Sequence, residues 1–224
     1  VKWLLPLTVC LLLVGAVWGL LIAPPDFRQG NSYRIIYIHV PSAVVALAGY
    51  YVMAFAGAVS LVWRIKMADV TMRAVAPVGA ALTAIALVTG AIWGKPTWGT
   101  WWVWDARITS MLILLFLYLG VVALFEAYEN KSAAARACAV LTLVGTVNIP
   151  IIYKSVDWWY SLHQPASIKF TGESVIDPSM LYPLLLMIGA FYCLFAVTVL
   201  LNMRAELAWN HRDASWLKQL VLGT

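Results

Sequence analysis

Residues 93–109 read WGKPTWGTWWVWDARIT and hold five of the twelve tryptophans in the chain. The tryptophans are interspersed with three charged side chains, Lys95, Asp105 and Arg107. Tryptophan combines a wide, polarisable ring with one N–H donor, so such a cluster suits a large planar aromatic ligand or the interface between a membrane and water. The rest of the sequence has to distinguish these two settings.

The composition indicates a membrane protein. Hydrophobic residues make up 63% of the 224 residues and charged residues only 11%, far below the roughly 25% charged residues of soluble domains. Six stretches contain no charged residue, and each approaches or exceeds the roughly 17 to 25 residues that a helix needs to cross a bilayer. The sequence therefore predicts an all-α integral membrane protein with one domain, residues 1–224, and six transmembrane helices. The predicted spans are residues 4–23, 35–63, 74–93, 108–125, 137–153 and 180–203.

The distribution of basic residues predicts the orientation in the membrane. The side that carries both termini holds nine of them: Lys2, Arg64, Lys66, Arg73, Lys131, Arg136, Arg204, Arg212 and Lys218. The other side holds six: Arg28, Arg34, Lys95, Arg107, Lys154 and Lys169. By the positive-inside rule both termini are cytoplasmic. The tryptophan-rich loop between helices 3 and 4 then faces outward, which in the inner membrane of a Gram-negative bacterium means the periplasm.

Several functional classes lack their sequence motifs. The three cysteines, Cys10, Cys138 and Cys193, lie inside predicted spans and form no Cys-x-x-Cys pair, so the chain is not itself a c-type cytochrome. No glycine-rich phosphate loop precedes a Lys-Ser or Lys-Thr pair. The chain is therefore expected to be no enzyme, to hydrolyse no ATP itself and to have no nucleic-acid partner.

One histidine lies near the start of the second predicted span. A helix over residues 35–63 would be about 43 Å long, more than the roughly 30 Å hydrocarbon core. Its first turns should protrude or bend, and Pro41 can supply the bend. His39 would then lie at the outer mouth of the membrane. An ionisable residue at this depth is a functional candidate, although a lone histidine can also be a satisfied interfacial side chain.

A second histidine belongs to the longest loop, residues 154–179, on the same side of the membrane. This loop begins near the pair Trp158 and Trp159 and reaches His163. Trp159 and His163 are four residues apart, so a short surface helix would place them on one face. The third histidine, His211, is expected to be a solvated residue of the cytoplasmic tail.

The outward face thus collects tryptophans, two histidines and several cations. If residues 97–109 are partly helical, Trp98, Trp101 or Trp102, and Asp105 share one face and form an aromatic platform. An ordinary aromatic belt is the alternative, but a belt distributes its tryptophans over several helix ends. Two imidazoles, an aromatic floor and nearby cations fit haem, whereas zinc usually takes three or four protein ligands.

Three segments carry a family resemblance. Residues 98–109 closely resemble the tryptophan-rich "WWD" motif of haem-handling proteins in cytochrome c maturation. Residues 31–41, NSYRIIYIHVP, and 157–163, DWWYSLH, look like the cytochrome c maturation protein C family, also called haem exporter protein C. The resemblance runs over nearly the whole chain, and the other WWD proteins are much larger. One departure is Ile108, where leucine is usual.

The resemblance implies a binding site for haem b, held as a ligand for transfer on the periplasmic side, with residues 93–109 as the WWD loop. Its axial ligands would be His39 and His163. The platform would consist of Trp98, Trp101, Trp102, Trp104 and Asp105. Arg34, Lys95 and Arg107 are candidates for propionate contacts, and Trp158 and Trp159 for secondary aromatic contacts.

The resemblance also implies partners: an ABC transporter of maturation proteins A and B, the small single-span protein D, and the haem chaperone E that receives the haem. Three other classes stay open. A cytochrome b-like electron-transfer protein would need histidines within neighbouring spans. A channel for haem would need a polar path through the spans, which carry no charged residue. A pure scaffold would leave the tryptophan cluster unexplained.

Overall fold

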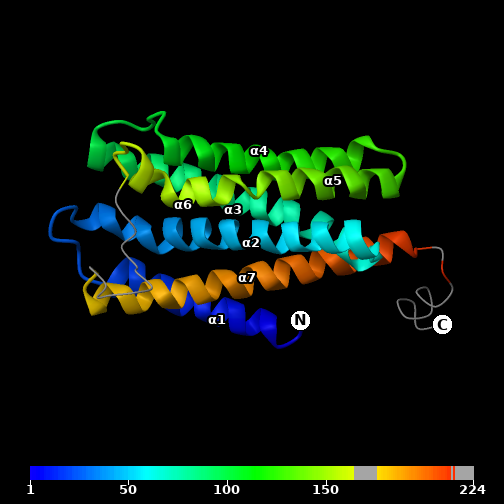
Figure 1. Ribbon diagram of the computed structural model, residues 1–224. Coiled ribbons are helices and arrows are strands. Elements are labelled where there is room, and N and C mark those ends of the chain that lie inside the picture. The colour runs from blue at the N-terminus through cyan, green and yellow to red at the C-terminus, as the bar shows by residue number, and fades with distance from the viewer. Residues whose placement is uncertain (164–175, 213, 215–224) are drawn as a thin grey trace.

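The computed structural model describes residues 1–163, 176–212 and 214, and this part of the chain is helical with no strand. Six helical stretches are long and apolar enough to cross a membrane, which confirms the predicted count. They lie side by side, and the N-terminal end of the first helix and the C-terminal end of the last point toward the same end of the bundle (Figure 1). The α-helices are α1 (Leu4–Ala16), α2 (Ile36–Trp63), α3 (Lys66–Trp98), α4 (Ala106–Ala127), α5 (Lys131–Gly145), α6 (Asn148–Trp158) and α7 (Pro178–Asn210).

Two of the spans combine α-helix with another turn type. The first continues from α1 into the π-helix Val17–Ile22, and the second begins with the 3₁₀-helix Asn31–Ile35 before α2. The long second span therefore starts with a tighter turn, and α2 runs on through Pro41 without interruption. A third span consists of α5 and α6, which are separated by a turn at residues 146–147.

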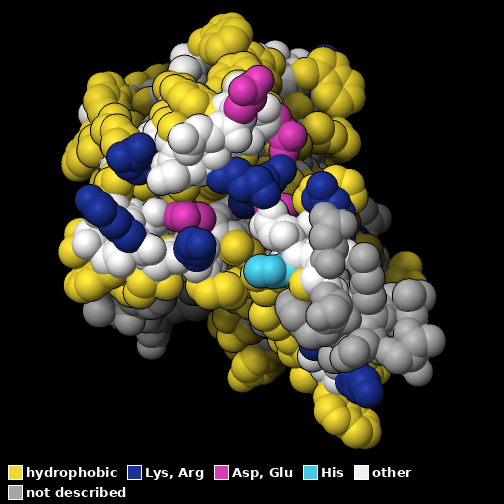
Figure 2. Space-filling view, turned by 90° about the vertical axis from the view of Figure 1, so that its right-hand side faces the viewer, with side chains coloured by type: hydrophobic (Ala, Val, Ile, Leu, Met, Phe, Trp, Pro, Cys, Tyr) yellow, Lys and Arg dark blue, Asp and Glu magenta, His cyan; other side chains and the backbone are white. Residues whose placement is uncertain are grey.

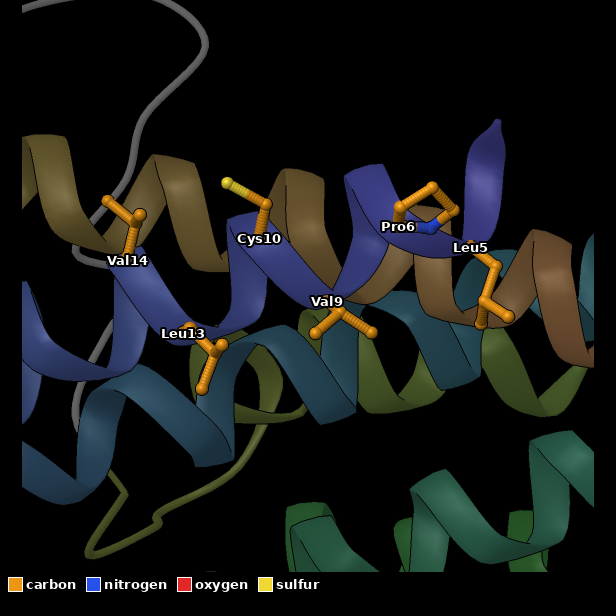
Figure 3. Close-up of a pocket in the computed structure, with 6 residues that line it drawn as sticks. All are labelled: Leu5, Pro6, Val9, Cys10, Leu13 and Val14. Carbon is orange, nitrogen blue, oxygen red and sulfur yellow. The ribbon is translucent and has the colours of Figure 1, made fainter. Parts of the chain in front are cut away.

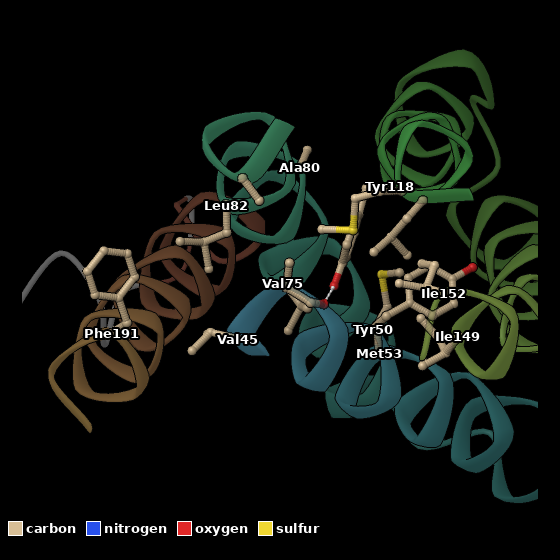
Figure 4. Packing of buried hydrophobic residues seen from close by; sticks show 14 of the residues in the cluster. Val45, Tyr50, Met53, Val75, Ala80, Leu82, Tyr118, Ile149, Ile152 and Phe191 are labelled. Atoms are coloured by element: carbon tan, nitrogen blue, oxygen red, sulfur yellow. Dashed lines mark hydrogen bonds between the residues drawn. The ribbon is translucent and has the colours of Figure 1, made fainter. Parts of the chain in front are cut away.

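The centre of the bundle is formed by α2 and α3. Helix α3 packs against α2, α4 and α7, and Figure 4 shows the apolar side chains that fill the space between these helices. The buried hydroxyl of Tyr118 donates a hydrogen bond to the Ala46 carbonyl at 2.7 Å. A Cβ on Gly79 would lie 2.1 Å from the Tyr118 ring. A glycine at this position therefore lets the ring fill the gap between α3 and α4.

Helix α1 lies on the outside of the bundle and packs mainly against α7. Its outer face is apolar and forms an open depression (Figure 3), lined by Leu5, Pro6, Val9, Cys10, Leu13 and Val14. An apolar helix face of this kind suits contact with lipid chains.

The end of the bundle that carries the termini is rich in charge (Figure 2). Arg73 there pairs with Glu126 at 2.7 Å and with Glu206 at 3.3 Å, which joins α3, α4 and α7. Two of the basic residues that enter the orientation argument, Lys169 and Lys218, lie outside the described residues. The orientation itself stays a prediction.

Residues 93–109 do not form one continuous loop. Helix α3 continues through Trp98 and ends where Gly99 adopts φ 80°, a left-handed conformation that glycine tolerates well. Helix α4 begins after Asp105, whose side chain accepts a hydrogen bond from the Ile108 backbone at 2.8 Å. The link between them, residues 100–105, is not helical. The prediction of one helical face with Trp98, Trp101 or Trp102, and Asp105 was wrong.

A second local prediction also fails. Helix α6 ends at Trp158, and Trp159 already has the extended backbone angles φ −131° and ψ 156°. Residues 159–163 are irregular, so Trp159 and His163 do not share the face of a short surface helix. The segment lies at the end of the bundle away from the start of α1 (Figure 1).

Candidate functional site

His39 projects from α2 onto one face of α3. Its ring nitrogen Nδ1 lies 2.9 Å from the Ala86 carbonyl oxygen and 3.2 Å from the Thr89 hydroxyl. A Cβ on Gly90 would lie 3.0 Å from Cε1 of the ring, so this glycine provides the space in which the imidazole sits. Because a carbonyl oxygen can only accept, the hydrogen-bond chemistry assigns the His39 proton to Nδ1 and leaves a lone pair on Nε2.

This arrangement is typical of a histidine that ligates a metal. Such histidines usually donate the other ring N–H to a carbonyl or carboxylate, which fixes both the tautomer and the ring orientation. The Thr89 hydroxyl donates to the Ile85 carbonyl at 2.6 Å, so it faces His39 Nδ1 with an acceptor lone pair. Both contacts therefore hold the proton at Nδ1.

Trp93 completes the support of His39. Its indole meets the imidazole edge to face, with ring centres 5.7 Å apart and an interplanar angle of 76°. On its other side it packs against Tyr33 at 5.6 Å, and its N–H donates to the Gln29 side chain at 2.7 Å. Trp93 is thus fixed at both ends, and the sequence reasoning assigned it no role in the site.

His163 reaches the same place from the segment after α6. Its ring centre lies 6.2 Å from that of His39 and 5.9 Å from that of Trp98. A metal ion bound at about 2 Å from a nitrogen of each of two imidazoles sets their ring centres roughly 6 Å apart. The ring centres of the two predicted ligand histidines therefore lie at a separation that fits one metal ion with the two rings on opposite sides of it.

Arg107 of α4 contacts His163 and the end of α6 through its guanidinium. Its Nη1 lies 3.4 Å from His163 Nδ1, its Nε donates to the Ser155 hydroxyl at 3.1 Å, and its Nη2 donates to the Tyr153 carbonyl at 3.1 Å. The guanidinium thus joins α4, the end of α6 and His163.

Asp105 has a structural part in the same junction. One carboxylate oxygen caps α4, and the other accepts a short hydrogen bond from the Ser161 hydroxyl. The Ser161 oxygen in turn accepts from the His163 backbone N–H at 3.0 Å. Asp105 therefore ties the His163 segment to the start of α4, and this contact has no sequence signal because it joins residues far apart in the chain.

The predicted platform tryptophans do not lie in one plane. Trp102 and Trp104 meet edge to face at 5.4 Å and 74°, while Trp101 is 57% and Trp104 is 74% exposed. The indole nitrogen of Trp102 is buried and has no hydrogen-bond partner among the described residues. Trp98, at the end of α3, is the platform residue whose ring contact with His163 is established.

The two predicted secondary aromatic residues pack against each other. Trp158 and Trp159 meet edge to face at 5.7 Å, and at least half of each side chain is exposed. Their ring contact is with each other. They lie at the end of the helix that leads to His163.

The other two basic candidates already have local partners. Arg34 donates to the Asn31 side chain at 3.2 Å and, through a short contact, to the Leu20 carbonyl. Lys95 donates to the Gly99 carbonyl at 3.0 Å, which helps to end α3. Of the three propionate candidates, Arg107 is the one in direct contact with a histidine of the pair.

The distribution of ligand-type side chains favours a two-histidine site. Within the described ranges, no group of three or more His, Cys, Asp or Glu side chains is placed to hold a metal ion. His211 is exposed at the C-terminal end of α7, at the opposite end of the bundle from the pair. The end of the bundle opposite the start of α1 thus offers two imidazoles with tryptophan rings beside them.

Comparison with known proteins resolves the family. The family model described as "Heme exporter protein C" matches residues 1–218. The chain belongs to the haem exporter protein C family. Proteins named "Heme exporter protein C" from Escherichia coli K12 and Haemophilus influenzae are 48% and 50% identical to this chain over 222 and 215 residues. These alignments cover 99% and 96% of this chain and 89% and 87% of the relatives.

A relative of the same name from Bradyrhizobium diazoefficiens is 51% identical over 205 residues, which is 92% of this chain and 78% of that protein. The predicted membership of the haem exporter protein C family is thereby confirmed. The family match identifies no individual site residue, so the roles of His39, His163 and the surrounding side chains rest on the geometry above.

Proposed function

We propose that this haem exporter protein C family member binds haem between His39 and His163 at the outer end of its helix bundle and passes it to another protein. Family membership supports a haem-handling role in cytochrome c biogenesis, as a transport subunit and not as a catalyst. The observation that carries the proposal is the meeting of the two imidazoles, 6.2 Å apart, at the end of α3.

Three local features fit haem as the ligand. His39 offers Nε2 while its Nδ1–H is bound to a carbonyl, as expected for an axial ligand. The rings of Trp93 and Trp98 border the two histidines. The Trp102 N–H is a buried donor in need of an acceptor, which a haem propionate can supply.

We assign the other predicted site residues roles around the haem. Trp98, Trp101, Trp102 and Trp104 surround the porphyrin, Asp105 fixes the segment that carries His163, and the pair Trp158 and Trp159 lies farther out. Arg107, Lys95 and Arg34 are the cations for the propionates, and each has N–H donors beyond those in its present hydrogen bonds.

We place the site on the periplasmic face of the inner membrane and the protein in a complex with maturation proteins A, B and D. The transferred ligand is haem b, and the receiving protein is the haem chaperone E. Support for this arrangement comes from the family and from the excess of basic residues at the opposite end of the bundle. Transfer requires that one axial position be exchangeable, so the chaperone replaces one of the two histidines.

The proposal is tested by the absorption spectrum of the haem-loaded protein and of His39→Ala and His163→Ala, oxidised and reduced. Each substitution is expected to convert a six-coordinate, bis-histidine spectrum into a weaker or five-coordinate one. His211→Ala, at the far end of the bundle, is the matched control and should keep the original spectrum. If both site variants keep it too, the ligands are elsewhere and a scaffold or channel role gains the stronger support.

A further inference from the structure

The Nδ1 atoms of the two histidines face different kinds of hydrogen-bond partner: an acceptor at His39 and a donor at His163. His39 donates from Nδ1 to the Ala86 carbonyl. His163 instead presents Nδ1 to Arg107, at 3.4 Å from Nη1. A guanidinium has only donors, so His163 Nδ1 is the acceptor and the proton of the neutral ring is assigned to Nε2. The neutral rings are therefore opposite tautomers.

This difference decides what each ring must do to bind iron. His39 has its Nε2 lone pair ready without any change of partner. His163 can use Nδ1 only after it separates from Arg107. To use Nε2, its proton must move to Nδ1, where the new N–H would face the donors of the guanidinium. By either route, iron binding breaks the contact between His163 and Arg107.

The surroundings of the two rings also indicate that His39 is held more firmly than His163. His39 lies within α2 and rests against Ala86, Thr89, Gly90 and Trp93, which share one face of α3. His163 lies beyond the end of α6, in an irregular segment. A side chain held between two packed helices is constrained more strongly than one on a connecting segment.

Arg107 itself is anchored independently of His163. Its Nε and Nη2 donate to Ser155 and to the Tyr153 carbonyl, both at 3.1 Å, and both acceptors belong to α6. When His163 moves toward the iron, these two bonds keep the guanidinium in place. Arg107 then remains a fixed donor to which the imidazole can return.

We propose that His39 is the axial ligand that retains haem during delivery and that His163 is the ligand that gives way, with Arg107 as the positioning residue that receives the released imidazole. This inference rests on the proposed function and adds the order of ligand loss. Arg107 stabilises the displaced form of His163, so it raises the fraction of haem with an open axial position.

The order of ligand loss is tested with His39→Gly and His163→Gly, each loaded with haem and passed through gel filtration with and without added imidazole. His163→Gly should retain haem on His39, and imidazole should restore the six-coordinate spectrum. His39→Gly should lose haem under both conditions. Haem retained by His39→Gly and lost by His163→Gly would reverse the assignment and overturn it. If neither variant alters the spectrum, it is the proposed function that fails.

The part of Arg107 is tested by the rate at which carbon monoxide binds the reduced, haem-loaded protein, because carbon monoxide must first find an open axial position. Arg107→Met removes the donor, so binding should be about fivefold slower, the effect of one hydrogen bond. Arg107→Lys restores a donor and should recover most of the rate. Arg28→Met removes an exposed cation from the same end of the bundle and serves as the control. A rate in Arg107→Met that equals or exceeds that of the control would exclude this role.

Discussion

The support of His39 by α3 can be tested with a single added methyl group, in Gly90→Ala. The new Cβ would lie 3.0 Å from His39 Cε1 and 3.5 Å from Nδ1, so the ring must shift by several tenths of an ångström. The bond from Nδ1 to the Ala86 carbonyl is 2.9 Å long, and such a shift brings it to the limit of a hydrogen bond. A ring freed from this bond has to be ordered again when haem binds, which costs about 1 kcal/mol and weakens haem binding about fivefold.

The same substitution should not lower the thermal stability of the protein, so a weaker haem affinity could not be explained by unfolding. Alanine is favoured over glycine by about 1 kcal/mol inside a helix, so Gly90→Ala should keep the thermal unfolding midpoint or raise it slightly. Haem titration of the purified apoprotein, followed by absorbance, measures the affinity. Gly189→Ala in α7 is the matched control, because its Cβ meets nothing within 4 Å. Equal haem affinities in Gly90→Ala and Gly189→Ala would refute the proposed support of His39.

Three further predictions concern the junction, the packing and the orientation. Asp105→Ala removes the cap of α4, which should cost about 1 kcal/mol of stability, lower the thermal midpoint in detergent and weaken the haem spectrum more than Asp105→Asn. Gly79→Ala places a Cβ 2.1 Å from the Tyr118 ring and should destabilise the bundle by about 1 to 3 kcal/mol through overpacking, measured by thermal unfolding against Gly189→Ala. A membrane-impermeant maleimide should label Phe27→Cys in intact cells but Glu129→Cys only after permeabilisation, and the reverse pattern would invert the predicted orientation.

The spans were predictable because lipid excludes charge and unpaired backbone groups from every residue of a crossing helix. Their ends were less so. The third span was predicted over residues 74–93, whereas α3 covers Lys66–Trp98. At one end Lys95 is still helical and its amine donates to the Gly99 carbonyl, and at the other Asp69 accepts a short hydrogen bond from Ser60. A charged residue therefore marks the edge of the hydrocarbon core and not the end of the helix.

The candidate site, too, could be predicted only in part from the sequence. The family resemblance named His39 and His163, but their separation depends on how α2, α3 and the segment after α6 pack, which no local pattern states. The contact of His39 with the Ala86 carbonyl could not be predicted, because its acceptor is a backbone group that every residue carries. The break between α3 and α4 could have been predicted. Gly99 and Asp105 are residue types that typically end and begin helices, which favours two helices with a short link over one helical face.

The tryptophans of the WWD stretch lie in two different surroundings. Trp93 and Trp98, both within α3, meet the rings of His39 and His163. Trp101 and Trp104 follow Gly99 and turn most of their surface outward, at 57% and 74% exposed. Exposed indoles at the end of a bundle suit the membrane–water interface, whereas rings that face imidazoles suit a planar ligand. The end of α3 at Gly99 separates these surroundings, and in our proposal the exposed rings border the haem from the interface side.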